Sequence, residues 1–325
     1  MNKPQAQAAL AALLVPFNAG QARLADGWLF GDFVRQVYLP FFRRKWKRTT
    51  ALCNEDRIEH HLYPEFAARK LRAFRREELQ NFLDRKAAAG LSFSIVDHLR
   101  WDLRQIFRMA LDEEILTRNP AELLFTPREC PRPNTAVMTR EEVQKSFSVL
   151  AMRERLIARL AIVAGMRPGE IFALKWVRLD REFADIRERV YRGDLDTPKT
   201  PRSVRWAALS DGLVEAIREW RELSRDRSPD AWVFPSEKGT TPLSKDNCWR
   251  RHFRPHLEAV GLGWVNFQVM RKTHNCLLKD LDVDPKVRAE QMGHTVDVNE
   301  NVYTQTSLSR RREAVNRLET SLWVN

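Results

Sequence analysis

The C-terminal part of this sequence combines an arginine, a histidine and a tyrosine in a spacing that suits attack on a phosphate ester. Arg271 lies in a segment with a helical apolar pattern, His294 follows two short predicted helices later, and Tyr303 comes nine positions after His294. A tyrosine hydroxyl is a poor nucleophile at neutral pH, because its pKa is about 10. Fixed cations and a histidine nearby make the hydroxyl easier to deprotonate and direct it toward an anion. A phosphodiester is the electrophile that such a site suits.

Two further cations of the same kind lie upstream. Arg167 directly precedes Pro168, and Lys199 lies in the predicted turn Thr197–Thr200. The planar guanidinium of arginine can bind two phosphate oxygens at once, and a lysine can give a proton to a departing oxygen. Each of these residues alone would more often be an ordinary surface cation. Their coincidence leads to the hypothesis of DNA strand cleavage by a tyrosine.

The elements that must position these residues begin with a capping-box signature, Thr139 followed by Glu142. A buried helix then breaks at Gly165, and Pro168 suits the first turn of a new helix. Beyond Trp176 the periodicity becomes strand-like in two segments that flank the turn carrying Lys199. The pattern predicts strands at 184–191 and 203–206, and helices at 211–224, 245–260, 271–280, 285–292 and 297–304.

The chain divides by pattern into five regions. Residues 1–27 are a lead-in, and 28–125 carry the apolar spacing of an all-α bundle of about four helices. Residues 126–137 contain three prolines and no apolar period, so they are the expected linker. The second domain is predicted at 138–305, followed by a tail at 306–325 with an apolar helical face.

Composition points to a polyanionic partner. The formal charge of +12 and the pI near 9.9 favour nucleic acid first and an acidic membrane surface second. A basic run with Trp46 interleaved is either a solvated turn or a clamp on the phosphates of a duplex; its cations are Arg43, Arg44, Lys45, Lys47 and Arg48. The four cysteines form no close pair, which favours reduced thiols in the cytoplasm over disulfides or a zinc site. The sequence contains no run of 18 apolar residues, so no membrane span is predicted.

With these residues placed, the chain resembles the tyrosine recombinase (phage integrase) family from about Trp28 onward. The helical N-terminal half is similar to the core-binding domain of that family. The resemblance implies a mainly α fold with a small antiparallel sheet, made of a helical core-DNA-binding domain and a mixed α+β catalytic domain. The segments that carry it are Gly90–Ser92, Arg118–Ala121, Ala164–Trp176, Pro198–Thr200, Val269–His274, Met292–His294 and Tyr303.

The resemblance also implies roles for the site residues. Tyr303 attacks the scissile phosphate and leaves a 3′-phosphotyrosyl link and a free 5′-hydroxyl. Arg167 and Arg271 bind the non-bridging oxygens, Lys199 protonates the departing oxygen, and His294 contacts the phosphate or helps to activate the tyrosine. The ester keeps the bond energy, so neither ATP nor a metal is required.

The implied function is site-specific recombination that integrates or excises a mobile element. The implied partner is double-stranded DNA with an inverted-repeat core site, bound by a tetramer whose protomers exchange their tails. Glu170 is expected to orient the neighbouring cations, and the enzyme to act at the nucleoid.

One position departs from the family pattern. Gln268 stands where the family usually has a histidine, and glutamine cannot exchange a proton near neutral pH. Cleavage is then slow, or another group such as Lys272 or His274 takes the proton. Two alternatives follow: a DNA-binding member of the family that has lost catalysis, and a type IB topoisomerase-like enzyme that relaxes DNA without a special site.

Overall fold

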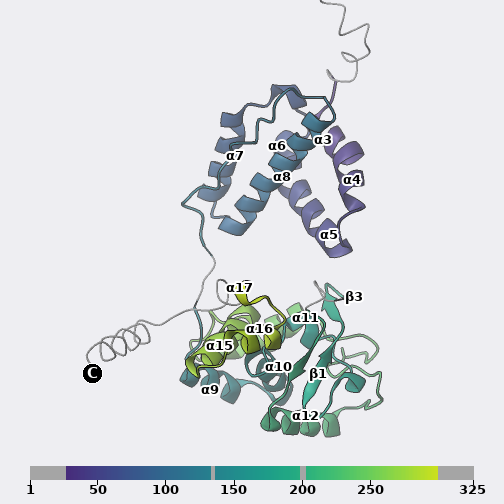
Figure 1. The fold of residues 1–325 in the computed structure, drawn as a ribbon, viewed down its shortest axis with the longest axis vertical. Helices are drawn as coiled ribbons and strands as arrows, with labels where there is room; N and C mark the ends of the chain where they lie inside the picture. The colour runs from purple at the N-terminus through teal and green to yellow at the C-terminus, as the bar shows by residue number, and fades with distance from the viewer. Residues whose placement is uncertain (1–26, 133–135, 198–202, 299–325) are drawn as a thin grey trace, which may run out of the picture. The chain divides into compact units, whose positions relative to one another are not determined.

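The computed structural model describes residues 27–132, 136–197 and 203–298, and it divides into two compact units, Met1–Asn134 and Thr135–Asn325. The boundary falls within the proline-containing segment 126–137. Each unit has its own hydrophobic core, and each is described by itself. Figure 1 shows the helices of unit 1 in purple and blue, and the helices and strands of unit 2 in teal to yellow.

In its described part, unit 1 consists of four continuous helical rods around an aromatic core. Phe30, Phe66, Phe74 and Phe107 lie within 6.0 Å of one another in successive ring contacts. Burial of these large rings is the main driving force for packing the rods together. The rods are α3–η1–α4 (Phe30–Phe33, Val34–Tyr38, Leu39–Arg43), α5–η2–α6 (Arg48–Arg57, Ile58–Leu62, Tyr63–Phe66), α7 (Arg76–Ala88) and α8 (Phe93–Asp112), with a short turn η3 (Leu71–Ala73).

Two rods of unit 1 and one helix of unit 2 contain a π-helical segment that ends two residues before a proline. The segments η1, η2 and η6 (Trp249–Phe253) are each followed two residues later by Pro40, Pro64 or Pro255. Proline has no N–H to donate, and its ring collides with the carbonyl four residues earlier. Widening the helix by one residue lets the chain continue past the proline without that collision. The three prolines therefore explain why these helices bulge rather than end.

Unit 2 is mainly helical and carries two small antiparallel ladders, which agrees with the predicted fold class. β1 (Phe183–Ile186) pairs with β4 (Arg205–Ala208), and β2 (Arg189–Tyr191) pairs with β3 (Asp194–Asp196). Helix α10 (Met152–Ile162) lies at the centre, against α12 (Asp211–Leu223) and α15 (Phe267–Asp280). The remaining elements are α9 (Arg140–Val149), α11 (Pro168–Ile171), η4 (Trp176–Arg178), α13 (Lys245–Cys248), α14 (Arg254–Ala259), α16 (Pro285–Met292) and α17 (Val296–Val298).

The strand prediction was partly wrong. The segment 184–191 is not one strand: it is divided between β1 and β2, and Asp194–Asp196 forms a further strand that the alternation did not indicate. Arg192 and Gly193 both have positive φ and form the two-residue turn between β2 and β3. Such a turn twists with the strands, so it allows a hairpin within a segment too short to predict from alternation.

Candidate active site

Helix α15 carries Arg271 into the interior of unit 2. The helix begins at Asn266, whose side chain accepts hydrogen bonds from the backbone N–H groups of Gln268 and Val269 at 2.9 and 3.0 Å. Arg271 is 3% exposed. Its guanidinium donates to the carbonyl oxygens of Gly165 and Met292. The cation is therefore held between two loops that lie far from each other in sequence.

The loop between α10 and α11 can approach α15 only because it contains a glycine. Gly165 has a φ of +63°, and a Cβ atom there would lie 2.5 Å from Cδ2 of His274. The imidazole of His274 packs against this glycine, and its Nδ1–H donates to the carbonyl of Ile162 at 2.9 Å. Burial lowers the pKa of His274 to about 4, so its ring is neutral at physiological pH. His274 thus fixes the loop whose carbonyl receives Arg271.

Arg167 lies at the start of the short helix α11, on the same loop. It donates from one terminal nitrogen to Glu170 Oε1 at 2.7 Å and from the other to the carbonyl of Gly293 at 3.1 Å. Its backbone N–H donates to the second oxygen of Glu170 at 2.9 Å. Arg167 and Arg271 therefore contact the consecutive carbonyls of Gly293 and Met292, which brings the two predicted phosphate-binding arginines to one turn of the chain.

Glu170 is almost fully buried and is shared between two arginines. Besides Arg167, it accepts two hydrogen bonds from the fork of Arg205, at 3.0 and 3.1 Å. Burial by itself would raise the pKa of the Glu170 carboxyl, but Arg205 and then Arg167 and Arg271 outweigh it and lower the pKa to about 2. Glu170 is therefore ionised, and it bonds to both Arg167 and Arg205.

His294 follows the left-handed turn that ends α16. Gly293 adopts φ +64°, and the backbone N–H of His294 donates to the carbonyl of Ala289 at 2.9 Å. Nε2 of His294 lies 3.0 Å from a terminal nitrogen of Arg271. Because arginine can only donate, Nε2 accepts and the ring proton is on Nδ1. Burial, together with Arg271 and Arg167, lowers the pKa of His294 to about 3, so the imidazole is neutral.

A cleft of about 1020 Å³ opens beside these residues. Its lining includes Arg167, Glu170 and Arg271, and Gln268 lies exposed in the same wall. The neighbouring elements add more cations, and those that line the cleft are Arg189, Arg192 and Lys245. Within the described residues, no cluster of three or more His, Cys, Asp or Glu side chains could hold a metal ion. The cations on the wall of this cleft can bind an anion.

Some predicted residues are not brought into this site by the described structure. Lys199 and Tyr303 lie outside the described residues. The basic run lies in unit 1, between α4 and α5, where Arg43 pairs with Glu55 at 2.6 Å and Arg44 stacks on the ring of Phe41 at 4.8 Å. Trp46 stacks on the partly buried Phe42 at 5.4 Å, so its ring packs against the core of unit 1.

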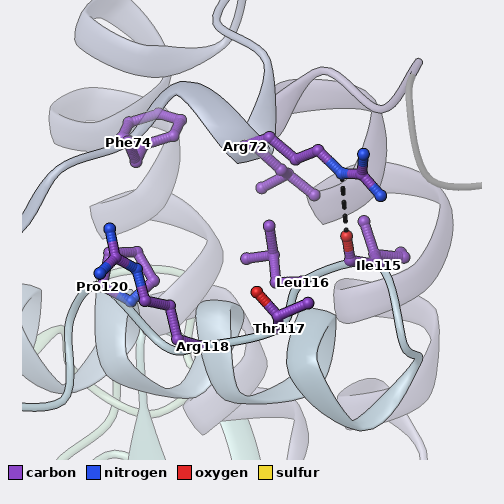
Figure 2. A pocket seen from close by; sticks show the side chains of 8 residues that line it. Arg72, Phe74, Ile115, Leu116, Thr117, Arg118 and Pro120 are labelled. Carbon is purple, nitrogen blue, oxygen red and sulfur yellow. Dashed lines mark hydrogen bonds between the residues drawn. The ribbon is translucent and has the colours of Figure 1, made fainter. Parts of the chain in front are cut away.

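A second hollow in unit 1 gathers none of the predicted site residues. It encloses about 300 Å³ and is lined by Leu71, Phe74 and the segment after α8. In Figure 2, the side chain of Arg72 reaches the backbone of Ile115, with a hydrogen bond of 3.4 Å.

The sequence did not indicate Arg205, and it left open whether His274 takes the proton. Arg205 lies on a predicted strand. Alternation indicates which face of a strand a residue occupies, but it does not indicate that Arg205 meets the buried carboxylate of Glu170. The ring of His274 is buried against Gly165, and it is bonded to the carbonyl of Ile162. Lys272 is also buried, at 6% exposure. Helix α15 is buried on all sides from Val269 to Cys276, so the alternation of apolar and polar residues could not mark Lys272 or His274 as interior.

The sequence pattern of the phage integrase family matches residues 103–310, which is more than half of the chain. The chain belongs to the phage integrase family. This confirms the resemblance to tyrosine recombinases and supports DNA recombination as the kind of function that this family member has. Within the described ranges, every helix is too short or too polar to cross a lipid bilayer.

Two relatives named as a recombinase or an integrase are similar over most of the chain. A XerC-like tyrosine recombinase of Caldanaerobacter subterraneus subsp. tengcongensis is 23% identical, covering 89% of this chain and 82% of the relative. The ICEBs1 integrase of Bacillus subtilis is 25% identical, covering 81% of this chain and 75% of the relative.

Solved structures of integrases have the same fold. The Tn1549 transposon integrase, in complex with transposon right end DNA, aligns with a TM-score of 0.74 at 16% identity, over 90% of this chain and 100% of that one. A lambda integrase dimer bound to a COC′ core site aligns with a TM-score of 0.66 at 15% identity, over 95% and 91% of the two chains. At this level of identity the likeness concerns the fold, and it confirms the predicted fold class.

Proposed function

We propose that this integrase family member is a site-specific DNA recombinase that cuts and rejoins DNA through a 3′-phosphotyrosyl intermediate. The observation that carries the proposal is the convergence of Arg167 and Arg271 on adjacent carbonyls of one turn, beside His294 and on the wall of a cation-lined cleft. Such fixed donors stabilise the charge that develops on phosphate oxygens, each typically by on the order of a hundredfold in rate.

The reaction is a transesterification with Tyr303 as the nucleophile. The phenolic oxygen forms a bond to phosphorus while the bond from phosphorus to the 5′ oxygen breaks. Lys199 gives a proton to the departing 5′ oxygen, and Arg167 and Arg271 bind the non-bridging oxygens. The reverse attack by a 5′-hydroxyl of another strand rejoins the DNA, and no external energy source is consumed because the ester conserves the bond energy.

Removal of the phenolic proton of Tyr303 is the slow step of this scheme. His294 is neutral, but its Nε2 already accepts from Arg271 and its low pKa makes it a weak base. Gln268 can bind a phosphate oxygen but cannot take a proton. The proton therefore passes to water through the exposed side of the cleft where Gln268 lies, and cleavage is slow compared with a site that has a base at this position.

Covalent capture tests this function. The chain is incubated with a library of short random-sequence duplexes that carry one nick, so that the fragment beyond the cleavage point diffuses away and the protein–DNA ester accumulates. We expect a slowly migrating band in a denaturing gel that is absent with Tyr303→Phe, and sequencing of the linked DNA identifies the site. Absence of the band with the wild-type chain overturns the enzyme proposal and favours a DNA-binding member without catalysis. Relaxation of supercoiled plasmids that lack the captured sequence favours a topoisomerase-like activity.

The relatives support a proposal for the DNA substrate and for the assembly of protomers on it. We infer a duplex with an inverted-repeat core site, gripped in part by Arg43, Arg44, Lys45, Lys47 and Arg48. The relatives include an ICEBs1 integrase and a transposon integrase, which supports integration or excision of a mobile element. A lambda integrase tetramer bound to a Holliday junction aligns with a TM-score of 0.65, which supports a tetramer on DNA.

Removal of the C-terminal tail tests the proposed assembly. Residues 306–325 lie outside the described residues, and their apolar face suits docking on a neighbouring protomer. Size-exclusion chromatography of the full chain and of a chain ending at residue 305, each with and without the captured duplex, should give a smaller DNA-bound assembly for the shorter chain. An unchanged assembly would show that the tail does not join the protomers.

A further inference from the structure

Arg205 is a third arginine beside the candidate active site, and it is buried without lining the cleft. Its side chain is 7% exposed, and its fork donates to both oxygens of Glu170 at 3.1 and 3.0 Å. Its Nε donates to the backbone carbonyl of Gln291 at 2.8 Å. A further bond runs from the same guanidinium to the carbonyl of Ser203 at 3.2 Å. All three nitrogens are therefore engaged in fixed directions.

The partners of Arg205 are the groups that hold the other two arginines. Glu170 accepts from Arg167, which reaches the carbonyl of Gly293. Gln291 precedes Met292, whose carbonyl receives Arg271. One guanidinium thus fixes both the carboxylate that orients Arg167 and the chain segment against which Arg167 and Arg271 lie.

A second set of bonds ties the same segment to strand β4. The side-chain amide of Gln291 donates to the carbonyls of Ala164 and Ala208 at 2.9 and 3.1 Å and accepts from the N–H of Ala208 at 3.0 Å. Arg205 and Ala208 are the first and last residues of β4. Strand β4, the end of α16 and the loop that follows α10 are therefore joined at two points. Arg205 is also only six positions after Lys199 in the sequence.

We propose that Arg205 is a positioning residue that keeps Arg167 and Arg271 at the spacing required to bind one phosphate. The inference rests on the proposed function, since it assigns the role through the phosphate that those arginines bind. Without the Arg205 fork, Glu170 keeps the hydrogen bond from Arg167 and draws that side chain away from the cleft, and the carbonyl of Gln291 loses the bond from Arg205. The two phosphate-binding arginines then change their relative placement, and small misplacements of this kind can cost on the order of a hundredfold in rate.

Two substitutions separate geometry from charge. Arg205→Lys keeps the positive charge, but a single ammonium cannot hold Glu170 and the Gln291 carbonyl in the directions of a planar fork. Arg205→Met removes both the charge and the donors while it keeps much of the volume. We expect both variants to slow single-turnover cleavage of the captured duplex at saturating protein, the Met variant by about a hundredfold and the Lys variant by at least about tenfold. Duplex affinity should change by less than about threefold, because most of it comes from other phosphates.

Arg153→Met is the matched control. Arg153 donates to Glu154, another almost fully buried glutamate of unit 2, at 2.8 Å from Nε, and it does not line the cleft. Its loss should lower the melting temperature about as much as the loss of Arg205, with the cleavage rate unchanged. Rate and amplitude are measured together: a merely structural role lowers the reactive fraction, whereas a positioning role lowers the rate constant of the whole folded population.

A measurement without catalysis keeps this inference separate from the proposed function. Binding of inorganic phosphate to the Tyr303→Phe chain is followed by NMR and compared with the same chain carrying Arg205→Lys, Arg205→Met or Arg153→Met. We expect about tenfold weaker phosphate binding with either Arg205 variant and none of this loss with the control. Full cleavage rate or full phosphate affinity in Arg205→Lys overturns the positioning role. A wild-type chain that captures no duplex overturns the proposed function, while phosphate binding still decides the role of Arg205.

Discussion

The two candidate phosphate-binding arginines are held by backbone carbonyls rather than by exposed acids. Arg271 lies between the carbonyls of Gly165 and Met292, and Arg167 reaches that of Gly293. Neutral acceptors fix a guanidinium without cancelling its charge, so the cation stays available to an incoming anion. Glu170 is the exception, and it is divided between Arg167 and Arg205. Folding of unit 2 therefore places the cations before any DNA arrives.

Gln268 offers the most direct test of the proton step. Because its side chain is exposed in the wall of the cleft, replacement by histidine should leave the stability within about 0.5 kcal/mol. An imidazole there can accept the phenolic proton, so we expect Gln268→His to raise the single-turnover cleavage rate by about tenfold to a hundredfold at neutral pH. The gain should fall away below the ordinary histidine pKa of about 6.5. Gln268→Asn serves as the control, and an equal rate in the His and Asn variants would rule out a proton-transfer role at this position.

Gly165 tests the approach of the loop to α15. Alanine at this position meets both the strain of a positive φ and the ring of His274, 2.5 Å from the new Cβ. Gly193 has a φ of +87° with nothing near its Cβ position, so Gly193→Ala measures the backbone strain alone, about 1–2 kcal/mol. In urea unfolding we expect Gly165→Ala to lower the free energy of unfolding clearly more than Gly193→Ala does. Equal losses of unfolding free energy would mean that the His274 ring moves aside without a free-energy cost.

At the scale of elements, the capping residues decide where the helices of unit 2 begin. Thr139 accepts from the N–H of Glu142 at 3.2 Å, and the Glu142 carboxylate accepts from the N–H of Thr139 at 2.8 Å. This reciprocal box was predicted from the two residue types alone, and the structure confirms it. Ser210 occupies the same position before α12, but its side chain makes no capping bond.

The contrast between these two caps gives a paired prediction. Thr139→Ala should lower the free energy of unfolding of unit 2 by about 1 kcal/mol, because it leaves an N–H of the first turn without its acceptor. Ser210→Ala should change it by no more than a few tenths of a kcal/mol, since no bond is lost. Chemical denaturation of the two variants and the parent measures both values. A cost for Ser210→Ala as large as that for Thr139→Ala would contradict the assignment.

Elements with a local signal could be predicted, and those set by distant contacts could not. Apolar spacing predicted helices such as 285–292, and proline and glycine marked their ends. The π-helical segments were not predicted, since a proline inside an apolar pattern is compatible with either a bulge or a break. The pairing of β1 with β4 depends on residues about twenty positions apart, and alternation does not specify a partner. The arginine boxes were found by residue type and order, whereas Arg205 required knowledge of which buried carboxylate it meets.

At the scale of the whole molecule, the chain forms two units, each with its own hydrophobic core. Unit 1 has an aromatic core with the basic run beside it, and unit 2 contains the cleft. The net charge of +12 suits both to the same polyanion. Stability of unit 2, however, depends on two histidines that must stay neutral inside it.

The buried histidines predict a loss of stability in mild acid. The pKa of His274 falls from 6.5 to about 4 and that of His294 to about 3, so below pH 6.5 the unfolded chain binds protons that the folded unit does not. The stability from both groups is fully present above 6.5 and is lost as the pH falls toward their folded values. Glu170 adds a further loss below its ordinary value of 4.5. Melting temperatures across this range should therefore fall, and less steeply for His294→Asn. Equal slopes in the two chains would contradict a depressed pKa for His294.

The left-handed turn at Gly293 has a mechanical consequence. Because Arg271 donates to the carbonyl of Met292 and Arg167 donates to that of Gly293, a rotation of this turn moves one acceptor of each cation. Each arginine also has an acceptor outside the turn, Gly165 for Arg271 and Glu170 for Arg167, so a movement of the turn changes the bonding of both guanidinium groups without carrying them as one body. A movement of the chain segment at His294 would therefore affect both guanidinium groups through this one turn.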